Sequence, residues 1–379
     1  MAVVTPRGNW GGGHENARSA AEHDLRYGRD LLRDESGQWP EYFMVSSPQA
    51  HGAARPQLAQ EPTAFEYART LDWSHLQAIT DRVPDGAKLI VGLGGGVALD
   101  ASKYVALKKG VPLILVPSII STGAIIHSVF AEWEGHRIVG SGETWPWIDF
   151  DHVVIDTQLV LKAPYHLNTA GLGDILCGYS GFCEWRRNTR MGIGEQFNES
   201  AVAVTAGHFD HITTGFPQTL DEAGDLTDDS VRFIMEAVQE RDSKSLRHPA
   251  AIQGDHSLWL AAEEINDRGW VHGEFVALAA VIIAWHCSGS ETLTGWLDAC
   301  KVRWRPGDIG VSREELRKAL EYVPEFMAAS SDGSDAPSIL RTEPVTGERF
   351  GALWSALGVP RDESMTASAC CASWKGDPS

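Results

Sequence analysis

The sequence predicts an N-terminal α/β domain with a parallel sheet, followed by an all-helical C-terminal domain. The chain has 379 residues, more than the ~250–300 at which one hydrophobic core usually stops growing. Apolar, strand-like runs alternate with helical patterns in the first part, as in a parallel sheet with helices on both faces. After about residue 160 the strand signals fade and helical patterns follow one another. We therefore expect domains at 1–160 and 161–379 with a cleft between them.

Four apolar runs carry the strand signal of the first domain. Turn-forming residues follow most of them, and they span 42–45 (YFMV), 88–93 (KLIVGL), 111–116 (VPLILV) and 152–156 (HVVID). Residues 1–40 have the composition of a loose arm followed by a short helix, and 63–83 that of a polar helix. Another helical pattern, VALDASKYVALKKG, starts directly after the glycine triplet 94–96.

The second domain shows apolar residues at helical spacing. The predicted helices span 174–187, 196–210, 229–240, 256–267, 272–287, 313–322 and 346–357. Residues 328–345 (AASSDGSDAPSILRTEPV) have the composition of a loop.

Charge and composition exclude several classes of function. A net charge of −19 argues against nucleic-acid binding, which needs a concentrated basic face. No run reaches the ~18–20 apolar residues of a membrane span, and the N-terminus lacks the pattern of a signal peptide. Six cysteines without CxxC spacing are no disulfide framework, so we expect a cytoplasmic protein. Cys370 and Cys371 are adjacent in a polar tail, either as incidental residues or as a reactive pair.

Two loops that follow successive predicted strands have the composition of a phosphate- and dinucleotide-binding edge. Gly94, Gly95 and Gly96 lie between a strand and a helix, where a backbone without Cβ lets an anion approach the helix N-terminus. The alternative is a tight packing turn, and the GxGxxG fingerprint is missing. The next loop, PSIISTGAIIHS (117–128), brings the hydroxyls of Ser118 and Ser121 to the carboxyl end of the sheet, where ligands of such sheets bind. Hydroxyls in loops also cap helices, but two such loops together favour a dinucleotide.

Three residues of the second half have the chemistry of metal ligands. Asp174, His256 and His272 each lie at or near the start of an apolar helical run. One carboxylate and two imidazoles make a three-ligand set with one position open, as in catalytic zinc sites. Taken singly, each residue is better explained without a metal: Asp174 as a helix N-cap, and each histidine as a core or surface residue.

Four motifs in order resemble the metal-dependent polyol dehydrogenases. They are GGGVALDASKYVA, PSIISTG, VVIDTQLVLKAPYHLNTAGLGDIL and DHSLWL followed by VHGEFVALAA, and together they cover about residues 85–290. This superfamily includes glycerol dehydrogenase, glycerol-1-phosphate dehydrogenase, the iron-containing alcohol dehydrogenases and the related 3-dehydroquinate synthase. The stretch 153–185 is most similar to glycerol-1-phosphate dehydrogenase.

The resemblance implies a dehydroquinate synthase-like fold with a Rossmann-like sheet. It implies that Asp174, His256 and His272 hold one divalent metal ion and are catalytic, and that the first domain binds NAD or NADP. It also implies a homo-oligomer, a dimer or larger. The expected cofactor-binding residues are Gly94, Gly95, Gly96, Val97, Ala98, Ser118, Ser121 and His127.

The chain departs from the superfamily pattern at four positions. Iron-containing relatives add a histidine where this chain has Gly178, so zinc is favoured over iron or nickel. Glycerol and glycerol-phosphate enzymes have an aspartate where this chain has Gly123, and glycerol-1-phosphate enzymes a histidine where it has Leu260. His127 replaces a small hydroxyl residue near the nicotinamide.

These observations predict hydride transfer between a nicotinamide and a metal-bound ketone, aldehyde or secondary alcohol. The substrate is expected to be polyol- or sugar-like, phosphorylated or not, and not glycerol 1-phosphate itself. Two alternatives remain: a 3-dehydroquinate synthase-like cyclase, whose GGKT-type loop is missing, and a binding protein on a former enzyme fold. In dinucleotide-binding sheets an acidic residue after a strand binds the ribose hydroxyls of NAD. Near Ser46 and Ser47, where we expect this position, the chain has no acidic residue, which weakly favours tolerance of NADP.

Overall fold

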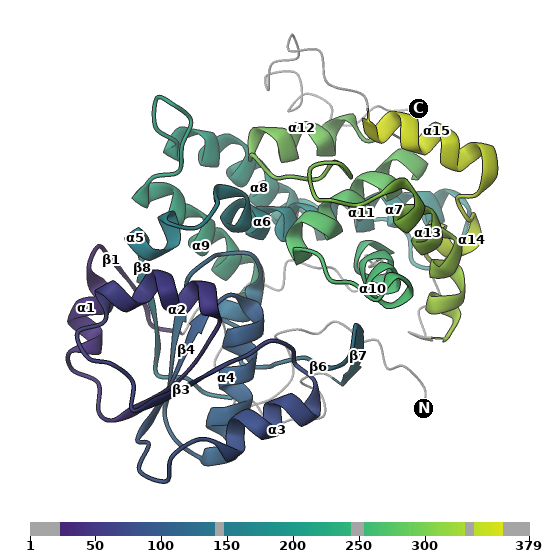
Figure 1. Ribbon diagram of the computed structural model, residues 1–379. Coiled ribbons are helices and arrows are strands. Elements are labelled where there is room, and N and C mark those ends of the chain that lie inside the picture. Colours follow the sequence, from purple (N-terminus) through teal and green to yellow (C-terminus); the bar gives the residue numbers. More distant parts are fainter. Residues whose placement is uncertain (1–22, 141–147, 244–253, 288, 330–336, 359–379) are drawn as a thin grey trace. The chain divides into compact units, whose positions relative to one another are not determined.

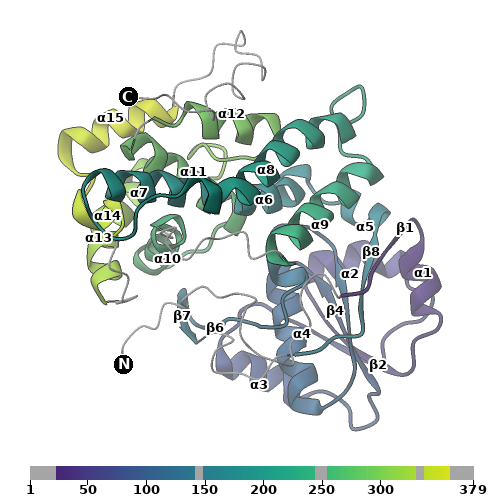
Figure 2. The ribbon, with the colours of Figure 1, turned by 180° about the vertical axis from the view of Figure 1, so that it is seen from behind.

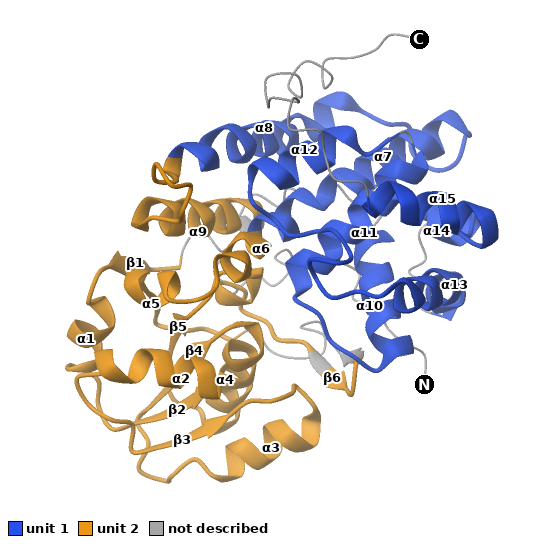
Figure 3. Ribbon diagram, turned by 45° about the horizontal axis from the view of Figure 1, so that its top comes forward, with its two compact units in different colours: residues 1–5, 172–218, 246–379 blue, residues 6–171, 219–245 orange. Residues whose placement is uncertain are grey.

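The computed structural model describes residues 23–140, 148–243, 254–287, 289–329 and 337–358. The chain divides into two compact units (Figure 3). Of the described residues, the unit that we call the sheet unit holds 23–140, 148–171 and 219–243, and the helical unit holds 172–218, 254–287, 289–329 and 337–358. Helix α6 (Tyr165–Leu176) carries the chain from the first to the second.

A six-stranded, fully parallel sheet forms the centre of the sheet unit. Its order is β1-β8-β5-β4-β2-β3. Strands β2 (Tyr42–Ser46), β4 (Leu89–Gly94), β5 (Leu113–Pro117) and β8 (His152–Asp156) confirm the four predicted runs. Every residue of these four strands is buried, as expected where helices cover both faces of a sheet.

Two edge strands were not predicted. β1 (Leu25–Gly28) pairs only with β8, and β3 (Ala64–Tyr67) only with β2. Both are short and only partly buried, so they lack the continuous apolar run that identifies a central strand. The helix expected over 63–83 is therefore wrong in its first part, and α3 (Trp73–Asp81) forms only after β3. A separate antiparallel hairpin joins β6 (Glu132–Glu134) and β7 (Arg137–Gly140).

Helices cover the two faces of the sheet. α1 (Leu31–Ser36), α2 (Pro48–Ala54) and α5 (Thr157–Leu161) contribute to a buried cluster with alternate residues of the central strands, including Met44 and Val91. α1 and α2 lie in front of the sheet in Figure 1 and behind it in Figure 2. α4 (Gly96–Lys109) packs on the opposite side, so closely that a Cβ on Gly92 of β4 would lie 2.1 Å from the Ser102 hydroxyl. α9 (Asp228–Ser243) completes this unit.

The helical unit is built around α11 (His272–Cys287), whose bounds are those predicted. Almost all of α11 is buried, and it packs against α7, α10, α12 and α14 (Figure 1). The helices of this unit are α7 (Gly178–Arg190), α8 (Glu199–Gly215), α10 (Gly254–Asn266), α12 (Glu291–Ala299), α13 (Arg313–Ala329), α14 (Ile339–Thr342) and α15 (Gly347–Gly358). Among the described residues after 156 there is no strand. In the whole described part of the chain, no helix is long and apolar enough to cross a membrane.

Two predictions in this part need correction. The single helix expected over 174–187 is two helices, because α6 ends at Leu176 and α7 begins at Gly178. The loop expected over 328–345 contains α14, which starts where the Ser338 hydroxyl accepts the backbone N–H of Leu340. Cys370 and Cys371 lie outside the described residues.

Candidate active site

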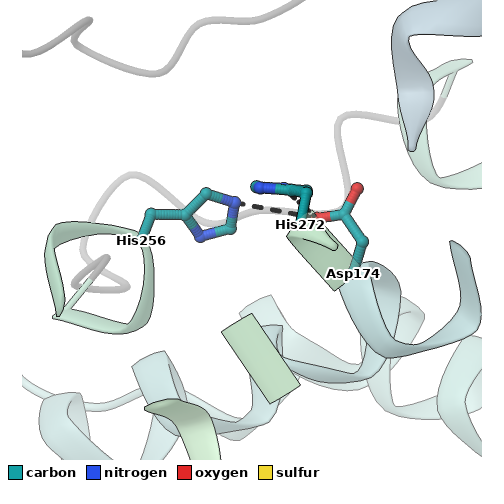
Figure 4. Close-up of side chains that lie close together, drawn as sticks. All are labelled: Asp174, His256 and His272. Atoms are coloured by element: carbon teal, nitrogen blue, oxygen red, sulfur yellow. Dashed lines mark hydrogen bonds and ion pairs between the residues drawn. The ribbon is translucent and has the colours of Figure 1, made fainter. Parts of the chain in front are cut away.

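Asp174, His256 and His272 come together within the helical unit (Figure 4). Asp174 lies in the last turn of α6, His256 is the third residue of α10, and His272 is the first residue of α11. The Nε2 atom of His272 is 3.2 Å from Asp174 Oδ1, and that of His256 is 3.6 Å from the same oxygen. The carboxylate is nearly buried, with 5% of its side chain exposed, while the imidazoles are 19% and 22% exposed. One atom of each side chain lies within 4.8 Å of the other two.

Gly173 allows two of these elements to come into contact. A Cβ on Gly173 would lie only 2.5 Å from the carbonyl oxygen of Gly273, so the backbones of α6 and α11 meet directly. Each glycine is adjacent to one of the candidate ligands, Asp174 or His272. The sequence GLGD therefore combines the candidate ligand Asp174 with the small residue that allows α6 to approach α11. Because Asp174 is inside α6, its alternative interpretation as a helix N-cap is wrong.

Asp255 orients the His256 ring. Its Oδ1 atom is 2.8 Å from His256 Nδ1 and 2.6 Å from the His256 backbone nitrogen, and its Oδ2 atom accepts the Ser180 hydroxyl at 2.9 Å. A carboxylate at Nδ1 places the proton there and leaves Nε2 to face Asp174, which is how ligand histidines are commonly held. Sequence reasoning missed Asp255, although an acidic residue directly before the histidine was a visible signal.

Trp259 packs edge-on against His272, with ring centroids 4.3 Å apart. Its indole N–H donates to Glu263 Oε1 at 2.8 Å, and the same oxygen accepts the backbone N–H of Trp270 at 2.9 Å. Burial raises the pKa of the Glu263 carboxyl to about 7. This arrangement ties α10 to the segment that precedes His272. Nothing in the spacing of the sequence pointed to it, because the indole contact depends on how two helices pack.

A second buried carboxyl, Glu184 on α7, lies behind α10. It accepts the hydroxyl of Ser338 at 2.5 Å and the backbone N–H of Ile339 at 2.7 Å. Within the described residues no hydrogen bond reaches its Oε2 atom, and burial raises its pKa to about 7. A Cβ on Gly254 would lie 2.9 Å from that oxygen, so Glu184 and α10 pack without a gap.

Cys177 forms a second grouping with Asp255 and His256. It shares His256 with the first grouping, and its sulfur lies 3.0 Å from the Asp174 carbonyl oxygen. The Nδ1 side of His256 is already occupied by Asp255. The set with Asp174 and His272 therefore has the better donor geometry, with an imidazole nitrogen from each histidine directed at one carboxylate.

In the sheet unit, the glycine turn lies where the chain connectivity of the sheet reverses. From β2 the chain continues to β3 on one side, and from β4 to β5 on the other, which makes the carboxyl ends of β2 and β4 a topological switch point. Gly94 has φ of +154°, which favours glycine, and Gly95 precedes α4 without a side-chain cap. Val97, in the first turn of α4, is 44% exposed.

The two predicted cofactor loops pack against each other. The Ser118 N–H donates to the Gly94 carbonyl at 2.9 Å. A Cβ on Gly95 would lie 2.8 Å from the Ile119 side chain, and one on Gly96 would lie 3.1 Å from Thr122. The glycines thus serve packing, the alternative considered from the sequence, at the same place where an anion would approach. Ser118 and Ser121 are buried, Ala98 is buried in α4, and His127 is partly buried with its N–H donating to the Gly123 carbonyl.

The end of β2 carries hydroxyls and no carboxylate. The Ser46 hydroxyl donates to the Leu93 carbonyl at 2.7 Å, and the Ser47 hydroxyl accepts the Ala50 N–H at 3.2 Å as the cap of α2. Both hydroxyls are therefore engaged with the backbone.

Comparison with known proteins finds similar dehydrogenases. Residues 45–164 match the family model described as iron-containing alcohol dehydrogenase. The chain is 24% identical over 265 residues to glycerol-1-phosphate dehydrogenase [NAD(P)+] of Aeropyrum pernix, covering 68% of this chain and 69% of that protein. The corresponding protein of Haloarcula marismortui is 23% identical over 80% of this chain and 89% of its own length. The chain is thus similar in sequence to members of the metal-dependent polyol dehydrogenase superfamily.

A solved structure has the same fold as this chain. A probable glycerol dehydrogenase from Sinorhizobium meliloti superposes with a TM-score of 0.62 at 20% identity, covering 89% of this chain and 98% of its own. The family-model match includes both predicted cofactor loops but ends before Asp174. The assignment of Asp174, His256 and His272 therefore depends on their geometry.

Proposed function

We propose that this chain is a metal-dependent oxidoreductase that transfers hydride between a nicotinamide cofactor and a ketone, aldehyde or secondary alcohol. The coarser class, an NAD(P)-dependent alcohol or polyol dehydrogenase, follows from the superfamily. The observation that carries the proposal is the convergence of one carboxylate and two imidazoles on a partly exposed point.

The donor set fits a divalent ion. Asp174, His256 and His272 provide three ligands of the types that zinc prefers, and three protein ligands are typical of a catalytic site with a position left for substrate. When bound, such an ion supplies Lewis-acid polarisation of a substrate oxygen. Asp255 keeps the His256 ring in the orientation needed for binding. Gly178, where iron-containing relatives have a further histidine, favours zinc.

The sheet unit is proposed to hold the dinucleotide. Gly94, Gly95, Gly96, Val97 and Ala98 would lie at the pyrophosphate, since helix α4 offers an uncapped N-terminus there. Ser118, Ser121 and His127 would lie on the nicotinamide side. The names of the curated relatives include NAD(P)+, and the absence of a carboxylate at the end of β2 supports use of NADP as well as NAD.

The substrate is proposed to be polyol- or sugar-like, with or without a phosphate, and not glycerol 1-phosphate. Gly123 and Leu260 stand where enzymes acting on glycerol phosphates present polar groups. Leu260 is buried one turn after His256, and its neighbour Trp259 lies against His272. A site without the hydrogen-bonding partner of a hydroxyl discriminates against the corresponding substrate by up to ~10⁴–10⁵.

The test is a screen of aldehydes, ketones and polyols with both cofactors and added zinc, followed at 340 nm. We expect a net change in NAD(P)H with at least one carbonyl compound, and dihydroxyacetone phosphate to be a poor substrate. If dihydroxyacetone phosphate is reduced with kcat/KM of ~10⁴ M⁻¹s⁻¹ or more, then Gly123 and Leu260 do not exclude glycerol phosphates as substrates.

The cyclase alternative is not favoured, because the relatives reported above are dehydrogenases. Turnover of a substrate without net change in NAD(P)H would support a 3-dehydroquinate synthase-like reaction instead. Assembly as a homo-oligomer stays a prediction for sedimentation or light scattering to decide.

A further inference from the structure

The ammonium group of Lys103 is fully buried beneath the second cofactor loop. Lys103 is on α4, two turns after the glycine triplet, and none of its side chain is exposed. Its Nζ atom lies 2.9 Å from Asp100 Oδ1 and donates to the carbonyl oxygens of Ala124 at 2.5 Å and Val129 at 3.2 Å. The three N–H groups of the ammonium thus meet three acceptors.

A buried charge is costly unless it is paired and hydrogen-bonded. Asp100 supplies the opposite charge from the preceding turn of the same helix, with 14% of its side chain exposed. The two carbonyls come from elsewhere in the chain, so the lysine joins α4 to another segment. Leucine or methionine would fill this core position without burying a charge, so filling space does not explain a lysine here.

The joined segment is the part of the loop that carries His127. Ala124 and Val129 are five residues apart, and one ammonium group binds both carbonyls, so residues 125–128 are held between two fixed points. The beginning of the loop is anchored separately, by Ser118 to Gly94 and by Ile120 to Asn168. Lys103 provides two hydrogen bonds from α4 to residues 121–129, and the Ser128 carbonyl also accepts the N–H of Ile148 at 2.9 Å.

We propose that Lys103 is a positioning residue that sets the nicotinamide-side loop relative to the pyrophosphate turn. The inference rests on the proposed function, because it takes residues 94–98 and 118–127 as the two halves of the dinucleotide site. Helix α4 begins at the first half and holds the second through Lys103, so one rigid element fixes the spacing between them. Lys103 acts through His127 and its neighbours and touches neither cofactor nor substrate.

The test compares Lys103→Met with Tyr104→Phe, a matched control. Methionine keeps the length of the side chain and removes the charge. Tyr104 is also fully buried on α4, and its hydroxyl donates to Gln77 at 3.3 Å. Phenylalanine removes this hydroxyl and keeps the ring that packs against Phe130. The first readout is amide hydrogen exchange of residues 121–129, where Ile126 and His127 donate to Gly123. It needs neither cofactor nor substrate. The second readout is the dissociation constant of NADH and NADPH, measured by calorimetry well below the unfolding temperature.

We expect Lys103→Met to speed exchange in residues 121–129 selectively and to weaken cofactor binding by about tenfold to a hundredfold, as for ~1 Å misplacement of a binding group. Tyr104→Phe should do neither. Should Lys103→Met not fold, Asp100→Asn keeps the ammonium group and weakens its ion pair, and it should speed exchange in the same segment to a smaller degree. The proposal is overturned if Lys103→Met folds and has wild-type amide exchange in residues 121–129 and wild-type affinity for NAD(P)H. If only Asp100→Asn folds, the same result in that variant overturns it. If the wild-type protein binds no NAD(P)H, the proposed function is refuted. Amide exchange in residues 121–129 would then still show whether Lys103 holds this loop in place.

Discussion

Gly173→Ala is the smallest change that should disturb the candidate metal site without altering any candidate ligand. The added methyl would lie 2.5 Å from the Gly273 carbonyl oxygen and 2.8 Å from a methyl of Val302. The first neighbour is backbone, so it cannot move aside by rotating a side chain. α6 and α11 must therefore separate at the point where they carry Asp174 and His272.

The size of the effect follows from these contacts. To reach 3.4 Å, where ordinary van der Waals contact begins, the oxygen has to move by about 0.9 Å, and such overpacking typically costs ~1–3 kcal/mol of stability. Metal–ligand distances tolerate only about ±0.2 Å. We therefore expect zinc affinity to fall by at least ~10-fold, in line with the 10–100-fold losses seen when ligand geometry is disturbed.

Gly207→Ala is the matched control. Gly207 lies inside α8 of the same unit, and a Cβ there meets nothing within 4 Å. Alanine at this position should stabilise the protein by about 0.4–1 kcal/mol and leave zinc binding unchanged. The assay is urea unfolding together with zinc titration of chelator-treated protein. Wild-type stability and zinc affinity in Gly173→Ala would refute the idea that direct backbone contact between α6 and α11 sets the ligand spacing.

Two further predictions concern buried carboxyl groups near the site. Asp255→Ala should weaken zinc binding by about 10–100-fold, since His256 loses the partner of its Nδ1 atom; equilibrium dialysis measures it, and an unchanged affinity would contradict the orienting role. Glu184→Gln tests pH dependence. Burial raises the pKa of Glu184 from 4.5 to about 7, so the stabilising, protonated form is fully present below pH 4.5 and is lost as the pH rises through 7. The free energy of unfolding of Glu184→Gln relative to wild type should therefore increase by about 3 kcal/mol between pH 4.5 and pH 8, and a constant difference in urea unfolding would count against it.

The fold was predictable where the sequence shows a strong period or a continuous apolar run. β4, β5 and β8 and the whole of α11 were predicted for that reason. β1 and β3 were not, because an edge strand has one partner and needs no fully apolar sequence. The break between α6 and α7 was also missed, since apolar spacing continues across it.

The site was predictable to the extent that it depends on residue types in family motifs. The structure brings together Asp174, His256 and His272, and whether they bind metal stays a prediction. Asp255 stands directly before His256 and was a visible signal that was not used. Trp259 and Lys103, in contrast, make contacts between segments that are separate in the sequence. Lys103, for instance, is 21 residues from Ala124. Such contacts exist only once helices and loops have packed, so local patterns do not reveal them.

The central claim is that Asp174, His256 and His272 form a divalent-metal site, and zinc stoichiometry tests it most directly. The experiment compares wild type with His272→Ala and with a control, His211→Ala. His211 is an exposed histidine on α8 of the same unit. Each protein is stripped of metal with a chelator and titrated with zinc by calorimetry. We expect about one tightly bound ion per chain in wild type and His211→Ala, and loss of that ion in His272→Ala. Equal stoichiometry and affinity in all three proteins would contradict it.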